Sequence, residues 1–272
     1  MRILLLGATG FIGRTVFSVL KEGGHEIYGT CHSKKPEADF TDCIFPFDVE
    51  APETIASILK SVEPEIIISS LRGDFSCQLS LHKALVDYVN QNKKRKLIFI
   101  STANIFDNDL NSPHTEADEP NAESDYGLYK TECENLLREA LATQAVIIRI
   151  PSVWDKSCPR IKQLITYKEQ GKSLQMWDNL MMNYATPPQI ANSISYIIEN
   201  NLTGIFHVGT KDMMKYWDFY KKVMRRLHLA APEIAMEHLD KTYYQAVLPT
   251  RTELPEELQM TVEDVLAACC SD

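Results

Sequence analysis

The chain has few of the features that mark membrane, metal or redox-active proteins. Only four apolar residues, 3–6, precede a glycine turn at the N-terminus, too few for a signal-peptide core or a membrane span. The seven cysteines show no Cys-x-x-C or Cys/His spacing, which predicts reduced thiols and no metal site. We interpret the adjacent Cys269 and Cys270 as part of a frayed apolar tail. These absences predict a cytoplasmic protein with no membrane partner.

Positive charge is also scarce. The 28 lysines and arginines are outnumbered by 37 aspartates and glutamates, which gives a formal net charge of -9. Binding to a nucleic-acid backbone depends on clustered Lys and Arg, so we expect no nucleic-acid partner. The one dense basic run, residues 93–96, lies between a helical stretch and an apolar strand and is interpreted as a solvated turn.

Short apolar runs alternate with stretches of helical period through the first 150 residues. Strands that are apolar throughout are typical of parallel sheets covered by helices on both faces. The alternation predicts an α/β fold, a Rossmann-type doubly wound parallel sheet. The predicted strands cover residues 3–6, 26–29, 44–47, 66–68, 97–100 and 145–150, and the predicted helices residues 15–21, 52–62, 81–89 and 126–141.

The alternation becomes less regular after residue 150. A helix over 160–170 and a strand near 174–177 are expected there. A helix over 190–198 and a strand over 205–208 then return to the main sheet, and beyond Asp212 we expect a helix followed by a loop-rich tail.

These patterns predict two structural parts. Residues 1–150 and 187–208 would form the dinucleotide-binding Rossmann domain, and residues 151–186 and 209–272 a smaller C-terminal substrate lobe. That lobe has basic and aromatic residues that could bind a nucleotide diphosphate or a base, although such residues are more often solvated charges or core residues. They are Arg160, Lys162, Lys211, Arg225, Arg226 and Arg251, and Trp154, Trp177 and Tyr184.

A glycine-rich loop, Gly7-Ala8-Thr9-Gly10-Phe11-Ile12-Gly13, follows the first predicted strand and opens a helix. Glycine suits a tight turn at Gly7, close approach of backbone to a pyrophosphate at Gly10, and packing of helix on strand at Gly13. Free N–H groups and the helix dipole favour negative charge at the helix N-terminus. The loop therefore predicts a dinucleotide site made by Gly7, Thr9, Gly10, Phe11, Ile12 and Gly13.

The second predicted strand ends without the carboxylate that normally binds the adenosine ribose of NAD. His32, Ser33 and Lys34 stand there instead, and imidazole, hydroxyl and ammonium groups could hold a ribose 2′-phosphate. We therefore predict NADP as the cofactor, with NAD as the alternative. Asp48, after the third strand, is placed to meet the adenine amino group or to cap the helix that begins near Pro52.

Tyr126 and Lys130 are four residues apart at the start of a predicted helix, so they lie on one helical face. An ammonium near a phenol favours the phenolate, which would bring Tyr126 toward a pKa useful for general acid/base catalysis. Thr102 ends the fifth strand at the edge where ligands of open α/β folds bind, and its hydroxyl could stabilise a developing alkoxide. These three residues are the predicted catalytic site. Tyr126 and Lys130 are also predicted to contact the cofactor on its nicotinamide side.

These motifs resemble the extended branch of the short-chain dehydrogenase/reductase superfamily. The glycine spacing matches its nucleotide motif, and Tyr126-x-x-x-Lys130 its catalytic pair. The stretch Ser101-Thr102-Ala103-Asn104-Ile105-Phe106 looks like the Ser-Thr-Asp-Tyr-Val-Phe stretch of dTDP-4-dehydrorhamnose reductases. The resemblance implies a keto-sugar reductase that uses Thr102, Tyr126 and Lys130.

Three departures from the family pattern affect the interpretation. An Asn-Ala-Ala-like run is replaced by Ser69-Ser70-Leu71-Arg72, so Ser70 is expected to keep a backbone contact to the cofactor while the side-chain chemistry differs. Ala103-Asn104 stands where dehydratases carry an acidic pair, which disfavours sugar-nucleotide dehydration. The tail around Arg251 is shorter than the family pattern, which weakens the expectation of a nucleotide site in the second lobe.

The sequence thus predicts an NADP-dependent reductase that acts on a keto group of a nucleotide-linked sugar or a similar small substrate. A sugar-nucleotide epimerase would use the same three residues and regenerate its cofactor. A non-catalytic, dinucleotide-binding regulatory protein is the alternative from another class. A homodimer is left open.

Overall fold

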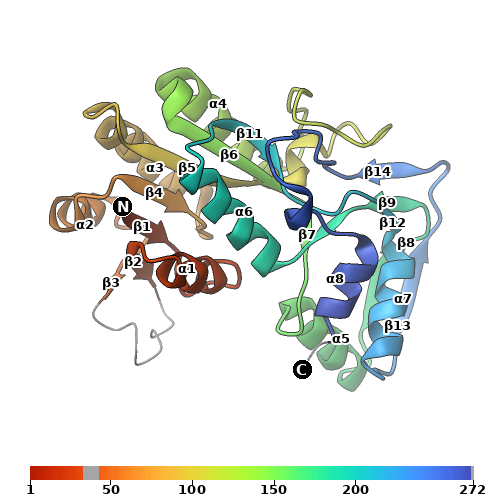
Figure 1. Ribbon diagram of the computed structural model, residues 1–272. Coiled ribbons are helices and arrows are strands. Elements are labelled where there is room, and N and C mark those ends of the chain that lie inside the picture. Colours follow the sequence, from red (N-terminus) through yellow and green to blue (C-terminus); the bar gives the residue numbers. More distant parts are fainter. Residues whose placement is uncertain (33–42, 271–272) are drawn as a thin grey trace.

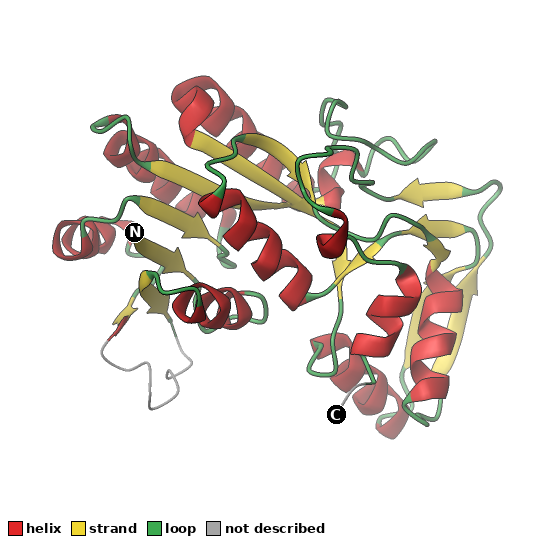
Figure 2. Ribbon diagram, in the orientation of Figure 1, coloured by secondary structure: helices red, strands yellow, loops and turns green. Residues whose placement is uncertain are grey.

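The computed structural model describes residues 1–32 and 43–270 of the chain. The predicted cofactor residues Ser33 and Lys34 therefore lie outside the described residues. The described part is an α/β structure in which a central sheet carries helices on both faces (Figure 1). A second group of short strands and helices lies at one end of that sheet (Figure 2).

The central sheet has seven strands in the order β11-β6-β5-β4-β1-β2-β3, all paired in parallel. The prediction of a doubly wound parallel sheet is confirmed, including the return of residues 205–208 to it. The strands are β1 (Arg2–Leu6), β2 (Glu26–Cys31), β3 (Ile44–Pro46), β4 (Ile66–Ser69), β5 (Lys96–Thr102), β6 (Ala145–Ile150) and β11 (Gly204–His207).

Alternate residues of the central strands pack against different helices. In β1, Ile3 and Leu5 face a core shared with α1 (Gly13–Glu22) and α6 (Pro187–Glu199). Leu4 and Leu6 face the opposite core, formed with α2 (Ile55–Val62), α3 (Phe75–Asn90) and α4 (Asp125–Leu141). Burial on both faces explains why these strands are apolar throughout.

The second part of the molecule has its own hydrophobic cluster around Trp154, Tyr184 and Phe219. Its helices are α5 (Pro159–Glu169), α7 (Tyr216–Arg226) and α8 (Val262–Ala268), and its strands β7 (Ser152–Val153), β8 (Ser173–Trp177), β9 (Leu180–Met182), β10 (Tyr184–Ala185), β12 (Met214–Lys215), β13 (Glu233–Glu237) and β14 (Tyr243–Gln245). Short 3-10 helices occur at Pro52–Thr54, Ala103–Phe106, Ala142–Gln144 and Glu256–Leu258.

Beyond Asp212 the expected helix is present as α7, but the tail after it contains strands β13 and β14 and helix α8, which the sequence did not predict. Strands β13 and β14 pair in parallel with β8 and β9, so their partners lie about 60 residues earlier in the chain, as in Ile234 with Leu174 and Tyr244 with Met181. Cys269 is fully buried at the end of α8, so the interpretation as a frayed tail is wrong too. Pairing over such distances leaves little local signal in a sequence.

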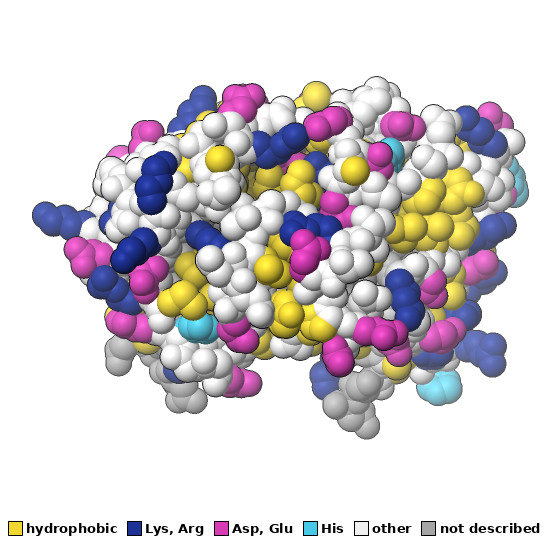
Figure 3. Space-filling model, turned by 45° about the horizontal axis from the view of Figure 1, so that its top comes forward, with side chains coloured by type: hydrophobic (Ala, Val, Ile, Leu, Met, Phe, Trp, Pro, Cys, Tyr) yellow, Lys and Arg dark blue, Asp and Glu magenta, His cyan; other side chains and the backbone are white. Residues whose placement is uncertain are grey.

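On the face shown in Figure 3, basic and acidic side chains are interspersed rather than gathered into separate patches. Within residues 1–32 and 43–270, no helix is both long and apolar enough to cross a membrane.

Candidate functional site

The glycine loop makes a sharp turn from β1 into α1. Gly7 has φ +82°, and a Cβ there would lie 2.5 Å from the Ser70 carbonyl oxygen. A Cβ on Gly13 would lie 2.1 Å from the Gly7 oxygen, so the helix packs directly on the turn. On Gly10 a Cβ would meet only the Gly7 oxygen, at 3.1 Å. Two glycines are thus required by internal packing, while Gly10 leaves its outer side open.

Strand β2 holds the loop in place. The Gly7 N–H donates to Thr30 Oγ1 at 3.0 Å, and the Ala8 N–H donates to the Thr30 carbonyl oxygen at 2.9 Å. Helix α1 begins after Ile12 with no side-chain cap. The Arg14 and Thr15 N–H groups donate to the Gly10 and Ile12 carbonyl oxygens at 3.1 Å. Among the residues that the structure describes, the Ile12 and Gly13 N–H groups have no such acceptor, so these two are available to an anion.

A cavity of about 740 Å³ lies at the carboxyl ends of β4, β5 and β6 and is closed on its other side by α5, β9, α7 and β14. Six of the predicted site residues line it: Phe11, Ile12, Ser70, Thr102, Tyr126 and Lys130. The other described members of the predicted site, Gly7, Thr9, Gly10, Gly13, His32 and Asp48, lie outside its lining.

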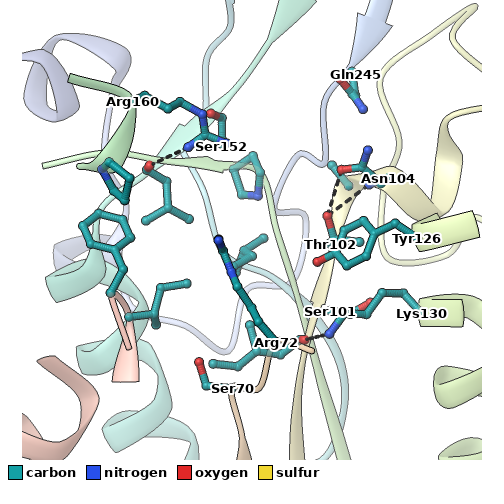
Figure 4. Close-up of a pocket in the computed structure, with 18 of the residues that line it drawn as sticks. Ser70, Arg72, Ser101, Thr102, Asn104, Tyr126, Lys130, Ser152, Arg160 and Gln245 are labelled. Carbon is teal, nitrogen blue, oxygen red and sulfur yellow. Dashed lines mark hydrogen bonds between the residues drawn. The ribbon is translucent and has the colours of Figure 1, made fainter. Parts of the chain in front are cut away.

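The three predicted catalytic residues converge on one side of this cavity (Figure 4). Tyr126 and Lys130 come from the first two turns of α4, and Thr102 from the end of β5. The Tyr126 side chain lies beside Thr102 in Figure 4. Lys130 is buried, and its Nζ donates to the Ile100 carbonyl oxygen at 2.9 Å and lies 5.9 Å from the centre of the Tyr126 ring.

The pKa of Tyr126 differs from the value that the sequence predicts. Tyr126 is 39% exposed, and partial desolvation raises the pKa of its phenol above its usual value of 10, although the Thr102 hydroxyl and the charge of Arg72 act in the opposite direction. Burial also lowers the pKa of Lys130 to about 8. The expected lowering of the Tyr126 pKa by Lys130 is not found, because the ammonium is directed to a backbone carbonyl. Tyr126 is therefore a neutral phenol near pH 7, a state that suits a proton donor.

Asn104 orients the Thr102 hydroxyl. Thr102 Oγ1 donates to Asn104 Oδ1 at 3.1 Å and accepts from the Asn104 N–H at 3.2 Å (Figure 4). The amide of Asn104 stands where dehydratases were expected to carry an acidic residue. Two hydrogen bonds hold the rotamer of Thr102 and keep its oxygen at the cavity wall.

His32 and Asp48 lie together at the ends of β2 and β3. His32 Nε2 is 3.5 Å from Asp48 Oδ2, and both side chains are exposed. Asp48 Oδ1 also accepts from the Glu50 N–H at 3.0 Å. Asp48 does not cap the following helix, whose Ala51 N-cap has no side-chain hydrogen bond. The pair places a carboxylate next to a residue expected to face a ribose phosphate.

Several cavity residues were not predicted as site residues. Ser101 is buried, and its hydroxyl has no hydrogen-bond partner within the described part of the chain. Arg72, Gln163 and Gln245 also line the cavity. The replacement of the Asn-Ala-Ala-like run by Ser69-Ser70-Leu71-Arg72 was the one sequence signal that pointed to Arg72.

Most of the candidate second-lobe ligands lie elsewhere. Of the six basic residues only Arg160 lines the cavity, where it donates to the Val153 carbonyl oxygen at 3.3 Å. Arg251 instead pairs with Glu253 and packs over Phe206. Trp154 and Tyr184 are core residues that pack on Phe219, whereas Trp177 lines the cavity.

Comparison with known proteins places this chain among reductase-like sequences. Residues 81–268 match the family described as "RmlD substrate binding domain". The chain is 23% identical to the "Probable low-salt glycan biosynthesis reductase Agl14" of Haloferax volcanii, over 98% of this chain and 97% of that protein. It is 24% identical to "Methionine adenosyltransferase 2 subunit beta" of Danio rerio, over 80% of this chain and 71% of that protein.

Solved structures with the same fold include nucleotide-sugar enzymes. A dTDP-4-dehydrorhamnose reductase from Clostridium acetobutylicum has a TM-score of 0.75 and 20% identity, with 98% of each chain covered. A dTDP-4-dehydrorhamnose reductase from Bacillus anthracis in complex with NADP has a TM-score of 0.72 and 18% identity, over 97% of this chain and 95% of that chain. The Bordetella bronchiseptica enzyme WbmH in complex with NAD+ has a TM-score of 0.80 and 14% identity, over 98% of this chain and 96% of that chain.

Proposed function

The chain belongs to the RmlD substrate-binding-domain family, a branch of the extended short-chain dehydrogenase/reductase superfamily of NAD(P)-dependent oxidoreductases, and we propose that it reduces the keto group of a nucleotide-linked sugar with NADPH. Residues 1–150 and 187–208 would bind the dinucleotide, and residues 151–186 and 209–272 the sugar nucleotide. The observation that carries the proposal is the convergence of Thr102, Tyr126 and Lys130 on one cavity.

The residues present fit a dinucleotide. The outer side of Gly10 is open to a close approach, and α1 begins without a side-chain cap. The buried Ser101 hydroxyl, which lines the cavity, lacks a hydrogen-bond partner among the described residues. A buried hydroxyl without a partner is unfavourable, so a ligand that bonds to it would be stabilised. Gly10, Ile12 and Ser70 are proposed to face the cofactor.

NADPH, when bound, supplies the hydride that reaches the carbonyl carbon. Tyr126, neutral near pH 7, donates its phenolic proton to the carbonyl oxygen as that oxygen gains negative charge. The Thr102 hydroxyl positions the same oxygen, and Tyr126 is reprotonated from solvent. Lys130, with a pKa of about 8, is mostly a cation at neutral pH; because its ammonium is held by the Ile100 carbonyl, it is proposed to contact the cofactor rather than to tune Tyr126.

The preference for NADP over NAD rests on the end of β2. The described residues at this end, Thr30, Cys31 and His32, include no acidic residue. Asp48 weakens the argument, because its carboxylate lies 3.5 Å from His32 Nε2.

The test is NADPH oxidation with a panel of nucleotide-linked 4-keto sugars that includes dTDP-4-dehydrorhamnose. We expect turnover, and we expect Tyr126→Phe to lower kcat at least about 100-fold, because a positioned proton donor contributes roughly 10²–10⁴-fold. NADPH affinity, measured by fluorescence titration, should change little. Tyr196→Phe on α6, away from the cavity, is the matched control and should keep normal kcat. Unchanged turnover in Tyr126→Phe would refute the mechanism.

Two other outcomes would indicate the alternatives. Tightly retained NAD after purification, together with interconversion of sugar epimers, would favour an epimerase. Intact dinucleotide binding without turnover of any keto sugar would favour a regulatory protein, a role that the similarity to a methionine adenosyltransferase subunit keeps open.

A further inference from the structure

The cavity is cationic in a chain of net negative charge. Its described lining includes the cationic side chains Arg72, Lys130 and Arg160 and no aspartate or glutamate. The whole chain carries a formal charge of -9. A cavity with positive charge and no internal counterion attracts anionic ligands.

Two of these cations already have acceptors. Lys130 Nζ donates to the Ile100 carbonyl oxygen at 2.9 Å. Arg160 donates to the Val153 carbonyl oxygen at 3.3 Å and lies over the Trp154 ring, 5.6 Å from its centre. Arg72, by contrast, has no hydrogen bond or ion pair to any residue that the structure describes.

Arg72 extends from the end of β4, beside Ser70, into the middle of the cavity (Figure 4). Tyr126 and Lys130 line the same cavity, so the Arg72 guanidinium shares it with the proposed reacting groups. The like charges of Arg72 and Lys130 repel each other. An anion bound at Arg72 would relieve that repulsion.

We propose that Arg72 forms a subsite for a carboxylate carried by the sugar of the substrate, close to the keto group. This inference rests on the proposed function and adds a substrate class, acidic keto sugars. A guanidinium offers two parallel N–H donors that match the two oxygens of a carboxylate.

The cofactor pyrophosphate and the substrate diphosphate are assigned to positions other than Arg72. We assign the cofactor pyrophosphate to the N-terminus of α1, where Gly10 and Gly13 lie outside the cavity lining and Ile12 lies at its edge. The substrate diphosphate is separated from the reacting carbon by the sugar ring. Arg160, which comes from α5 on the opposite side of the cavity, is placed to meet that diphosphate (Figure 4). We therefore assign Arg72 to a negative group of the sugar, and the NADPH affinity of Arg72→Gln tests whether it serves the cofactor instead.

Calorimetric titration of the NADP-loaded protein with UDP-glucuronate and UDP-glucose tests the subsite. The two ligands share base, diphosphate and sugar ring and differ in a carboxylate against a hydroxymethyl group. We expect UDP-glucuronate to bind roughly 10- to 100-fold more tightly, the usual range for a charge-assisted hydrogen-bonded pair. Arg72→Gln should bring the affinity ratio to about one, and Arg72→Lys should keep part of it.

Controls separate this subsite from other effects. Arg225→Gln, at an exposed arginine of α7 outside the cavity lining, should leave the ratio unchanged. Arg72→Gln should keep the thermal stability, the NADPH affinity and the UDP-glucose affinity of the parent protein. Equal affinities of the parent protein for both ligands, binding of neither, or weaker NADPH binding in Arg72→Gln would overturn the proposal.

The titration requires no turnover. A carboxylate preference that depends on Arg72 would therefore stand even if no keto sugar were reduced. Conversely, reduction of neutral keto sugars without any carboxylate preference would support the reaction and reject the subsite.

Discussion

Thr102 illustrates how a single side chain serves both the fold and the site. Its Oγ1 accepts from the Asn104 N–H and so caps the 3-10 helix Ala103–Phe106. The same oxygen donates to Asn104 Oδ1 and lines the cavity beside Tyr126. A hydroxyl held in this way meets a developing alkoxide without first reorganising, which is the basis of preorganised electrostatic stabilisation.

We expect Thr102→Val to lower kcat by roughly 10²–10³-fold, the range found when one such donor is removed. The free energy of unfolding should fall by about 1 kcal/mol because the cap is lost. Steady-state kinetics and denaturant titration measure the two effects. Thr102→Ser keeps the hydroxyl and should recover most of kcat. A kcat in Thr102→Val equal to that in Thr102→Ser would show that the hydroxyl has no catalytic role.

Helix α4, which carries the proposed catalytic pair Tyr126 and Lys130, is anchored at its N-terminus and at its middle. Ser124 caps the first turn, because its Oγ accepts from the Gly127 N–H at 3.0 Å. The same hydroxyl donates to the Asp107 carboxylate. Two turns later Glu134 forms a fully buried ion pair with Arg149 of β6, at 2.8 Å. Removing one partner of such a pair would leave a buried charge uncompensated. The cap and the ion pair therefore fix the helix on which Tyr126 and Lys130 stand.

Comparing the N-caps of α4 and α8, Ser124 and Thr261, separates an effect on kcat from an effect on stability. Ser124→Ala and Thr261→Ala each remove an N-cap hydroxyl, and each should cost about 1 kcal/mol of unfolding free energy. Only Ser124 caps the turn that carries Tyr126. We therefore expect only Ser124→Ala to lower kcat as well, by several-fold. Denaturant titration and steady-state kinetics on both variants check this. Equal kcat in the two variants would mean that the cap does not position Tyr126.

At the scale of the whole molecule, the cavity lies between two hydrophobic cores. Phe11, from the glycine loop, packs against both the core under α1 and α6 and the separate cluster around Trp154. The glycine loop is thereby linked to the part of the chain that closes the cavity. The cores also bury titratable groups, among them His82, which is fully buried and bonded to Ser69 and to the Gln78 carbonyl oxygen.

Burial lowers the pKa of His82 from 6.5 to about 4, and the charge of Lys130 acts in the same direction. The unfolded chain therefore binds a proton between pH 6.5 and 4 that the folded protein does not bind, so stability falls as the pH drops through this range. At 1.36 kcal/mol per pKa unit, the loss of unfolding free energy from this residue reaches about 3 kcal/mol.

Denaturant titrations at pH 7 and 4.5 should show a smaller loss of unfolding free energy for His82→Gln than for the parent protein. His228→Asn, at an exposed position with φ +50° that Asn tolerates, should keep the parent pH dependence. An unchanged pH dependence in His82→Gln would contradict the assignment.

From the amino-acid sequence one could predict the central sheet and which residues would share a cavity. Apolar strands with regular helical spacing predicted β1 to β6 and β11, because burial on both faces imposes that pattern locally. The spacing of Tyr126 and Lys130 and the position of Thr102 at a strand end predicted that the three would meet, and they do. Both inferences hold because periodicity along a helix and the common direction of parallel strands are local properties.

Tertiary structure alone decided what those residues face. The pairing of β13 and β14 with distant strands replaced an expected loop, and the Ile100 carbonyl, rather than Tyr126, receives the Lys130 ammonium. The sequence showed Arg72 only as a departure from a family pattern, whereas the fold places its guanidinium in the cavity. The physical reason is that a hydrogen-bond partner or a counterion is chosen by proximity in space, and these groups lie tens of residues apart in the chain.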